Sequence, residues 1–573
     1  MNQQATLPNE PLFAQLLHLS KHTQHVVIHD SASGVEANAA QLLASMMAMR
    51  QSIYDSLPKT DFNEKGLVVG HMPSMLVIAP GNYEYFVAAF ATLSLGAAVV
   101  PTSMGIMPEE AHYLLQRCTS TCILAGSQCM DRAEEIKIYA ASQGLQVTVV
   151  PITTEQTPRV VPVIDEALTI PPDHPSIILF TSGSTGPPKG AVHSRRLFHS
   201  SPKNPSGEVF LSHRPIHWVA GAMPPLKQLL NGSRVETLQQ VAMDDLAQAL
   251  WERLRKGDVT IVSCTPPVWS RMAKFFQQHL RQLPNDELGQ YVRGIQNLRV
   301  ARVSGSATAP SVLRFWREML GWPLKNCYAS TEHASPIMET DNLSDIDLEA
   351  SSFFIRCIGK PRPGVMVKLS EGDSGEILVK SPFLFSGYLD DEEATRAAFD
   401  DQGFHKTGDF AHRVGDHYVL DGRASTDFAR YYGYKVPIQL VEIHLNELAY
   451  IHEGCILPVP DPRTAGRVAA LVRFVDDSPE AAGKKNLNAI RADLSDKLAA
   501  YQLPTLLRIL QTGEEIAKAA VSGKFLRKQA VGQFFPTCQD FELLSNVEVW
   551  DENTAQMGPR KAWDWAGLSN STS

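Results

Sequence analysis

The sequence predicts an α/β protein with a large N-terminal domain of parallel-rich sheets covered by helices plus a small antiparallel unit, followed by a small α+β C-terminal domain. The chain has 573 residues, more than one ordinary domain requires. Its first half alternates short apolar runs with helix-like segments, which is typical of parallel sheets covered by helices. After about residue 355, short strands separated by turns take over.

Apolar runs and turn residues position the elements of the large domain. A run at residues 75–79 ends in Pro80, Gly81 and Asn82, which are turn residues, and a continuous apolar stretch follows. We predict strands at residues 75–79, 97–100, 145–150 and 177–180, a buried helix at residues 83–95, and antiparallel strands at residues 365–369 and 375–379.

Gly422 and Arg423 mark the predicted boundary between the two domains. Beyond them we predict helices at residues 440–448 and 487–499 and strands at residues 455–459 and 469–475. The predicted parts are a large N-terminal domain at residues 1–423, a small C-terminal domain at residues 424–530, and an irregular, Trp-bearing tail at residues 531–573.

Composition excludes several classes of protein. Hydrophobic residues make up 44% of the chain and charged residues 20%, an ordinary balance for a soluble globular protein. The net charge of −9, without a block of Lys or Arg, argues against a nucleic-acid partner. No apolar stretch approaches the ~18 residues of a membrane span, and no secretory signal is expected. Eight cysteines without C-x-x-C pairs predict reduced core thiols in a cytoplasmic protein.

The densest chemical signal is a loop of hydroxyl and glycine residues that ends in a lysine. Glycines let the backbone approach phosphate oxygens, free N–H groups form an anion-binding nest, and hydroxyls donate further hydrogen bonds. Pro188 stands where a Walker A loop requires its second glycine, so P-loop chemistry is not expected. The predicted phosphate-binding residues are Thr181, Ser182, Gly183, Ser184, Thr185, Gly186 and Lys189.

With this loop and further motifs in order, the sequence resembles the adenylate-forming superfamily. That superfamily includes acyl- and aryl-CoA synthetases, firefly luciferase and the adenylation domains of nonribosomal peptide synthetases. The resemblance covers about residues 25–530 and implies that ATP and Mg²⁺ convert a carboxylic acid into an acyl-adenylate. The further matching segments are residues 96–101, 304–307, 328–332, 387–399, 407–409, 421–423 and 522–524.

The resemblance also implies roles for single nucleotide-binding residues. A flat aromatic ring can pack on adenine, a hydroxyl can donate to phosphate, and a carboxylate is a hard ligand for a hard cation. The implied contacts are Ser304, Gly305, Ser306 and Ala307 around adenine, Tyr328 on its ring, Thr331 at the α-phosphate, Glu332 at magnesium, Asp409 at the ribose, and Arg423 at ribose or phosphate.

In the family the small C-terminal domain is mobile and swings about a hinge. One pose places a lysine, here Lys524, between the substrate carboxylate and the α-phosphate, where a cation is needed because two anions meet. The other pose brings in a loop that contains Arg430 and Gly433, for thioester formation with coenzyme A. The usual hinge acid or lysine is replaced by Ser425 or Thr426.

The acid itself is expected beside His217, which resembles the histidine at the acyl site of CoA ligases. Amino-acid-activating domains carry an aspartate just after this position, but Trp218 stands here, so a substrate ammonium group would lack its counter-ion. Mostly small and apolar residues, with no fixed cation, predict an acid with an uncharged apolar tail. The pocket candidates are Trp218, Val219, Ala220, Gly221, Ser306, Cys327, Ala329, Ser330, His333, Pro336 and Met338.

These motifs predict an AMP-forming acyl- or aryl-CoA ligase, an acid–thiol ligase whose tail and loops suggest specialised metabolism. An alternative is a stand-alone adenylating enzyme that loads an acyl group onto a carrier protein in trans. A third hypothesis is a nucleotide-binding pseudoenzyme, but the presence of Lys524, Glu332, Asp409 and Arg423 argues against it. Catalytic roles therefore fall to Lys524, Thr331, Glu332 and His217.

Overall fold

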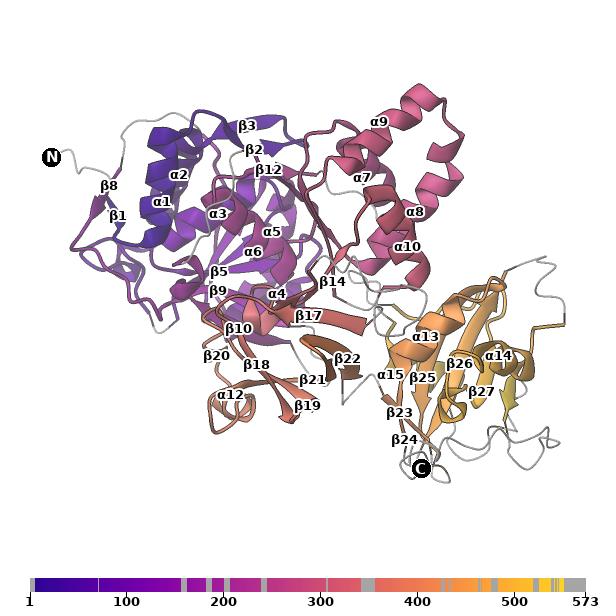
Figure 1. The fold of residues 1–573 in the computed structure, drawn as a ribbon. Helices are drawn as coiled ribbons and strands as arrows, with labels where there is room; N and C mark the ends of the chain where they lie inside the picture. Colours follow the sequence, from indigo (N-terminus) through magenta and orange to yellow (C-terminus); the bar gives the residue numbers. More distant parts are fainter. Residues whose placement is uncertain are drawn as a thin grey trace.

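Two large sheets with helices against them form most of the molecule, and a smaller sheet lies to one side of them (Figure 1). A computed structural model of the chain describes residues 6–70, 72–155, 162–181, 188–199, 207–238, 245–305, 308–341, 356–423, 428–431, 434–461, 464, 466–475, 483–518, 525–536, 541, 544 and 546–550.

The first large sheet has seven strands and a parallel centre. In spatial order it consists of β20 (Gly387–Tyr388), β10 (Lys189–Ser194), β9 (Pro175–Thr181), β5 (Ala98–Thr102), β4 (Ser74–Ile78), β6 (Cys122–Ala125) and β7 (Thr148–Pro151). Strands β9, β5, β4, β6 and β7 run parallel, whereas β10 and β20 are antiparallel to their neighbours. The strands predicted from apolar runs in this half are confirmed, with bounds that differ by up to three residues.

The second large sheet has thirteen strands and joins two patterns that the sequence suggested were separate. In spatial order it consists of β18 (Met366–Glu371), β19 (Ser374–Lys380), β21 (His405–Val414), β22 (His417–Arg423), β17 (Cys357–Pro361), β16 (Met338–Glu339), β15 (Lys325–Tyr328), β14 (Val300–Ser304), β13 (Ile261–Cys264), β11 (Val209–Ser212), β12 (Arg234–Thr237), β2 (Val26–Asp30) and β3 (Val35–Asn38). The predicted antiparallel unit is therefore a continuation of a parallel sheet through β16 and β17.

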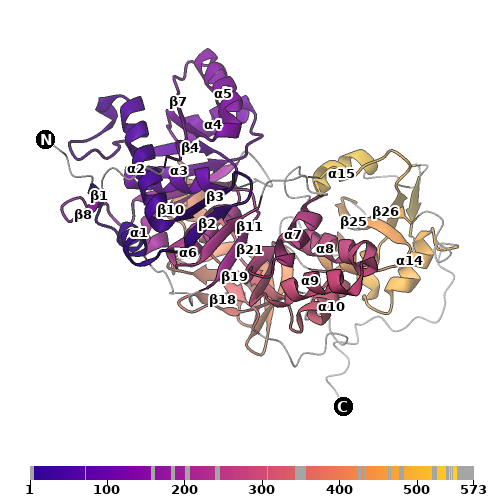
Figure 2. The same ribbon diagram turned by 90° about the horizontal axis from the view of Figure 1, so that it is seen from above.

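Helices pack on both faces of the parallel part of each large sheet (Figures 1 and 2). One core lies between the two sheets, a second lies under α4 and α5, and a third lies under α7 to α10. The helices are α1 (Pro11–His22), α2 (Ala39–Ser56), α3 (Tyr83–Ser94), α4 (Pro108–Arg117), α5 (Met130–Ser142), α6 (Val219–Leu230), α7 (Leu246–Arg255), α8 (Pro266–Gln278), α9 (Asn285–Gln296), α10 (Pro310–Leu320) and α12 (Glu392–Ala397).

Strand β4 shows why the layers form. Its side chains alternate between faces, and since both faces are covered by helices, both sets are apolar. Met75 and Val77 belong to the core between the sheets, whereas Leu76 and Ile78 belong to the core under α4 and α5.

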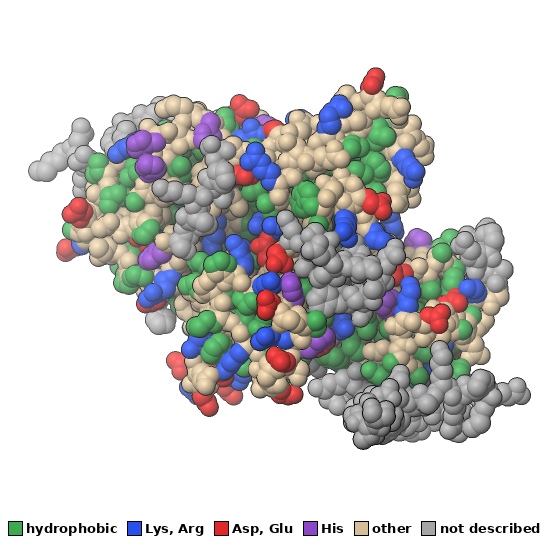
Figure 3. All heavy atoms as spheres, viewed as in Figure 1, with side chains coloured by type: hydrophobic (Ala, Val, Ile, Leu, Met, Phe, Trp, Pro, Cys, Tyr) green, Lys and Arg blue, Asp and Glu red, His purple; other side chains and the backbone are tan. Residues whose placement is uncertain are grey.

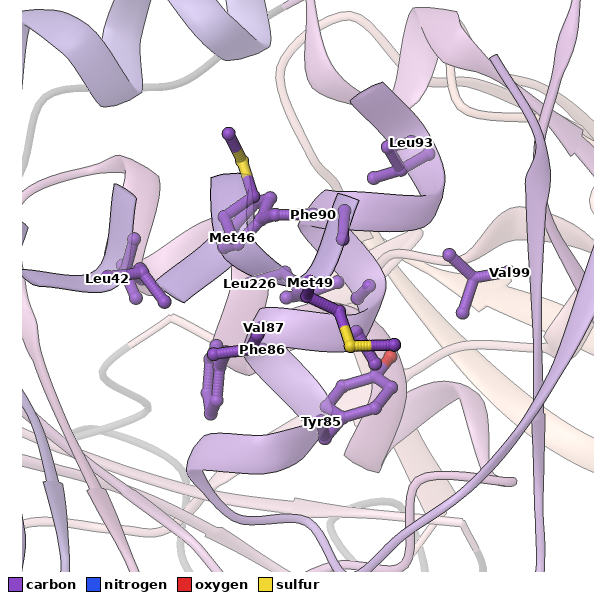
Figure 4. Close-up of a cluster of buried hydrophobic side chains, with 14 of the residues drawn as sticks. Leu42, Met46, Met49, Tyr85, Phe86, Val87, Phe90, Leu93, Val99 and Leu226 are labelled. Carbon is purple, nitrogen blue, oxygen red and sulfur yellow. The ribbon is translucent and has the colours of Figure 1, made fainter. Parts of the chain in front are cut away.

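Helix α3 lies in the middle of the central core, with every residue buried, as the sequence predicted. Side chains from α2, α3 and α6 meet there (Figure 4). The hydroxyl of Tyr85 donates to the backbone oxygen of Ala222 at 3.2 Å, which satisfies a phenol that could not be left unpaired at this depth. This bond links α3 to the first turns of α6, a helix that borders the site described below.

The C-terminal part is built on a four-stranded sheet with apolar clusters on both faces. Its strands are β25 (Ile451–Val459), β26 (Arg467–Phe474), β27 (Leu506–Ile509) and β28 (Val547–Val549), its helices are α13 (Ile438–Asn446), α14 (Leu487–Leu494) and α15 (Arg527–Phe534), and β23 (Phe428–Tyr431) pairs with β24 (Tyr434–Pro437). The domain boundary at residue 423 stays a prediction.

The tail differs from its irregular prediction. Strand β28 pairs antiparallel with β27, and the guanidinium of Arg491 lies 3.8 Å from the ring centroid of Trp550. The Glu548 carboxylate accepts a hydrogen bond from the backbone N–H of Leu487 at 2.7 Å, at the start of α14. Three residues were too short a run to predict this strand, which forms because β27 offers an open edge.

The surface agrees with the composition. Acidic and basic side chains are interspersed among the described residues on the face in Figure 3. The seven described cysteines are buried and unpaired, as expected for core thiols. None of the helices in the described part of the chain is both long and apolar enough to cross a bilayer.

Candidate active site

Two ends of the predicted phosphate loop lie side by side. Thr181 closes β9 and Lys189 opens β10, and the two residues are partners in the antiparallel ladder. The ammonium of Lys189 lies 3.4 Å from a carboxylate oxygen of Asp391 and 5.3 Å from the ring centroid of Tyr388. Residues 182–187, which include five of the predicted phosphate ligands, lie outside the described residues.

The predicted adenine and ribose residues meet directly. Tyr328 ends β15, Asp409 lies in β21, and the tyrosine hydroxyl donates to Oδ2 of Asp409 at 2.6 Å. Asp409 is 8% exposed and pairs in register with Arg423 of β22. The ladder thus places the backbones of Asp409 and Arg423 side by side, and the Tyr328 side chain reaches Asp409 from β15. The side chain of Arg423 is not among those described.

Glu332 is held at the start of a short turn after β15. Its Oε1 accepts a hydrogen bond from the Tyr388 hydroxyl at 3.0 Å, and its backbone oxygen accepts one from Phe385 N–H at 2.7 Å. Burial alone would raise the pKa of the Glu332 carboxyl, but hydrogen bonds from N–H and hydroxyl groups outweigh it and leave that pKa below its ordinary value. The carboxylate is therefore ionised at neutral pH.

Tyr388 connects the phosphate loop with this carboxylate. Its ring lies beside Lys189 of the seven-stranded sheet, and its hydroxyl contacts Glu332 in the turn that follows β15. Strand β20, which carries Tyr388, pairs with β10, and this pairing brings a distant part of the chain to the loop. The cation and the carboxylate thus border the same region, as phosphate and magnesium binding require.

A layer of histidines supports the turn from behind. Nε2 of His193 lies 2.8 Å from the backbone oxygen of Thr331, and Nε2 of His333 lies 3.2 Å from Nδ1 of His405. Burial lowers the pKa of His193 to about 4, so it is neutral and can donate from Nε2. His333 is fully buried beside the Glu332 turn, and its place in the acid pocket stays a prediction.

The predicted acid side of the site is the segment before α6. Trp218 is the N-cap of that helix, and the rings of His217 and Trp218 meet edge to face with centroids 6.1 Å apart. Burial lowers the pKa of His217, which favours its neutral form. A Cβ atom at Gly221 would lie 2.0 Å from the oxygen of Pro215, so only glycine fits where this segment packs against the helix.

The other predicted site residues lie either at the edge of the described part of the chain or outside it. Ser304 ends β14 and Gly305 follows with a φ of 106°, a backbone conformation that favours glycine. The residues outside the described part are Ser182, Gly183, Ser184, Thr185, Gly186, Ser306, Ala307, Ser425, Thr426, Gly433 and Lys524, and of Arg430 only the backbone is described.

Comparison with known proteins agrees with the resemblance to adenylate-forming enzymes. Residues 65–389 match the family described as "AMP-binding enzyme". The chain is 36% identical over 536 residues to "Acyl-CoA ligase oryP" of Aspergillus oryzae, an alignment that covers 92% of this chain and 93% of that protein. The chain belongs to this family of adenylate-forming enzymes. As a member of the family, it is an AMP-forming acid–thiol ligase.

A more distant sequence relative and a solved structure extend the comparison to the fold. A malonate–CoA ligase of Arabidopsis thaliana is 26% identical over 502 residues, covering 80% of this chain and 78% of that one. The crystal structure of ATP-bound MatB from Rhodopseudomonas palustris superposes with a TM-score of 0.72 at 18% identity, covering 92% of this chain and 98% of that one. The α/β fold with its large N-terminal domain is confirmed by these similarities.

Among the described residues, Glu332 is the carboxylate that would suit magnesium at this site. Within the described ranges no group of three or more His, Cys, Asp or Glu residues could hold a metal ion. Mg²⁺ commonly uses one or two carboxylates and completes its shell with water and substrate phosphates. The ionised and oriented carboxylate of Glu332 suits such a partial ligand set.

Sequence reasoning missed the residues that support the family motifs. Tyr388 was part of a recognised motif without a role, and His193 and Arg214 were not selected at all. Tyr388 is placed by the pairing of β10 with β20, His193 by the contact of β10 with the turn after β15, and Arg214 by the pairing of β11 with β13. No local sequence pattern reveals these long-range contacts. Arg214 offered one signal: it is a charged residue between an apolar strand and the predicted acid segment.

Proposed function

We propose that this ligase forms an acyl-adenylate from ATP and a carboxylic acid and then transfers the acyl group to coenzyme A. The observation that carries the proposal is the meeting of Lys189, Tyr388 and Glu332 at the ends of two sheets. Anionic phosphates would lie between a cation and a magnesium-binding carboxylate, beside the Tyr328–Asp409 pair that would hold the nucleoside. The relative in Aspergillus oryzae is named an acyl-CoA ligase, which agrees with coenzyme A as acceptor.

Each of the proposed site residues would then have its own role in the reaction. Tyr328 and Asp409 would position the nucleoside, while Thr331, held by His193, would direct its hydroxyl to the α-phosphate. Magnesium, when bound, would neutralise phosphate charge as the carboxylate attacks the α-phosphate and pyrophosphate leaves. Lys524 would supply the second cation for that step, and the loop around Gly433 would belong to the thioester step.

The acid is the finer part of the proposal. Trp218 and Val219, at the start of α6, would offer an apolar wall, which suits an acid with an apolar portion. Malonate–CoA ligases among the relatives are named for an acid with two carboxylates. The acids to be tested therefore include aliphatic, aromatic and polycarboxylic acids. Participation in specialised metabolism and location in the cytoplasm stay predictions from the sequence.

The test is acid-dependent release of pyrophosphate, measured across such a panel with and without coenzyme A. We expect one acid class to release pyrophosphate and, with coenzyme A present, to yield AMP and a thioester in equal amounts. Adenylate formation without a thioester would favour the carrier-protein alternative. The absence of acid-dependent pyrophosphate release from a folded, ATP-binding protein would favour the pseudoenzyme.

A variant of the metal ligand tests the assignment of Glu332. Glu332→Gln should shift the magnesium dependence of pyrophosphate release to higher concentration, because a neutral amide is a weaker ligand for Mg²⁺. Glu393→Gln, on the exposed start of α12, is the matched control and should leave the magnesium dependence unchanged. A normal rate for Glu332→Gln at limiting magnesium would contradict the assignment.

A further inference from the structure

Arg214 is a buried cation at the edge of the thirteen-stranded sheet. It follows β11, is 8% exposed, and extends along the carboxyl ends of the neighbouring strands. Its Nε donates to the backbone oxygen of Ser263 at 3.0 Å, its Nη2 to Oγ of Ser263 at 3.3 Å, and its Nη1 to Oγ of Ser304 at 3.3 Å. Three neutral oxygens thus hold the guanidinium in place.

No carboxylate neutralises this guanidinium within the part of the chain that the structure describes. Two other arginines, one buried and one half-buried, each have one: Arg195 contacts Glu10 at 2.5 Å, and Arg302 contacts Glu339 at 3.1 Å. Burial lowers the pKa of Arg214, yet an arginine keeps its charge in proteins. A buried charge without a counter-ion is costly, so its presence calls for an anion that arrives from outside.

The position of Arg214 points to the carboxylic acid. The carboxyl ends of β11, β13, β14 and β15 share one edge, and Ser304 of β14 pairs in register with Cys327 of β15. Ligands of open parallel sheets bind at this edge. A Cβ atom at Gly221 would lie 2.6 Å from the Arg214 oxygen, so the first turn of α6 packs directly on this residue.

We propose that Arg214 binds a second carboxylate of the acid, so that the substrates are dicarboxylic or tricarboxylic acids of which one carboxylate is activated. This inference rests on the proposed adenylation of a carboxylic acid. The three hydrogen bonds use three of the five N–H donors of the guanidinium, and its planar fork matches a carboxylate. Trp218 and Val219 would then face the carbon chain between the two carboxylates, which replaces the uncharged tail that the sequence suggested.

Two other roles for Arg214 give different results. A guanidinium that contacted the nucleotide through the Ser304 loop would raise the KM for ATP in its variants with every acid. A guanidinium that only fixed the strand ends would, when replaced, lower the rate with every acid by the same factor. Only a contact to the second carboxylate makes the loss depend on that group.

The experiment compares pairs of acids that differ in one charge. Each dicarboxylic or tricarboxylic acid is paired with the analogue in which one carboxylate is an amide, and kcat/KM is measured by pyrophosphate release. In the wild type we expect at least one diacid to exceed its amide by roughly tenfold or more. Arg214→Gln should lower kcat/KM for that diacid by roughly tenfold to a hundredfold and leave the amide and the KM for ATP within about twofold.

Two further variants serve as controls for this comparison. Arg214→Lys keeps the charge without the fork and should retain part of the preference for the diacid. Arg302→Gln alters a neighbouring guanidinium that already has a carboxylate partner, so the ratio of diacid to amide should stay unchanged. Equal use of diacid and amide by the wild type, or equal loss with both in Arg214→Gln, would overturn the inference.

A binding measurement keeps this inference separate from the proposed function. The same diacid should raise the midpoint of thermal unfolding of the wild type more than its amide does, and Arg214→Gln should lose that difference. If no acid releases pyrophosphate, the proposed function fails, while the diacid-dependent shift still decides on Arg214. If monocarboxylic acids are adenylated and no diacid shifts the midpoint, the inference fails and the proposed function stands.

Discussion

A hydrogen bond joins Tyr328 and Asp409, which belong to separate sequence motifs. Its hydroxyl donates to Asp409 at 2.6 Å, and Asp409 is almost buried, so the carboxylate is oriented before any ribose arrives. A donor that fixes a carboxylate in this way reduces the ordering that must accompany nucleotide binding. If Tyr328 and Asp409 bind the nucleoside as proposed, the ring and the hydroxyl of this one side chain would serve different parts of it.

Tyr328→Phe isolates the contribution of this hydroxyl. Loss of a hydrogen bond to a charged group costs about 1.5 kcal/mol, so we expect the KM for ATP to rise roughly tenfold. The KM for the acid should change little, because Asp409 is expected to contact only the ribose. Steady-state kinetics with each substrate varied in turn measure both constants.

Tyr418→Phe is the matched control for that variant. Tyr418 is also a buried tyrosine on the thirteen-stranded sheet, and its hydroxyl donates to the backbone oxygen of Val367 at 3.3 Å. It should leave the KM for ATP unchanged. A similar rise in both variants would attribute the effect to the sheet rather than to the nucleoside site.

The sequence predicted the strands and helices themselves better than it predicted which strands pair with one another. The continuous apolar run of β4 and the wholly buried α3 were evident, because burial on both faces leaves a continuous hydrophobic signal. The pairing of β20 with β10, which brings Tyr388 to Lys189, was not, because a two-residue strand has no periodicity. Strand β28 was missed for the same reason.

The site shows the same division between local and distant signals. The motifs that surround Tyr328, Glu332 and Asp409 are contiguous in sequence, so their location could be predicted. The contacts of Arg214 could not be predicted in this way. They form because β11, β13 and β14 lie side by side, which places Ser263 and Ser304 around its guanidinium. Arg214 was therefore not included among the candidates for the acid pocket that the sequence suggested.

The close packing of Gly221 at the start of α6 can be tested by substitution. Gly221 packs so closely on the preceding segment that an added Cβ atom would lie 2.0 Å from the Pro215 oxygen. Gly221→Ala should therefore shift the helix start and lower the free energy of unfolding by about 1–3 kcal/mol. It should also impair acid binding, because Trp218 and Val219 would move with the helix. Chemical denaturation and the KM for the acid measure the two effects.

Gly532→Ala is the corresponding control in a helix with space. Gly532 lies in α15, and apart from its chain neighbours and the backbone of its own helix, no described heavy atom lies within 4 Å of the position that a Cβ atom would occupy. Alanine there should stabilise the protein by about 0.5–1 kcal/mol, because it removes backbone freedom from the unfolded chain. Destabilisation by both substitutions would contradict the steric explanation for Gly221.

At the scale of the whole molecule, the decisive question is whether two halves of the reaction use different parts of the C-terminal region. Lys524 and Gly433 both lie outside the described residues, and both are assigned by resemblance alone. The lysine would be needed while carboxylate and α-phosphate react, whereas the glycine loop would be needed when coenzyme A attacks. If the C-terminal domain had one fixed position, the need for Lys524 and the need for the Gly433 loop could not be assigned to separate steps.

Lys524→Ala and Gly433→Leu should therefore fail in opposite steps. Removing one preorganised donor from such a transition state costs about 10²–10³ in rate, so Lys524→Ala should lose adenylate formation by that factor. Given synthetic acyl-adenylate and coenzyme A, it should form the thioester near the wild-type rate. Gly433→Leu should adenylate normally but form thioester slowly, since a bulky side chain blocks the close approach that glycine permits. Single-turnover assays of each step decide the matter, because equal losses in both steps would contradict a C-terminal domain that alternates between two poses.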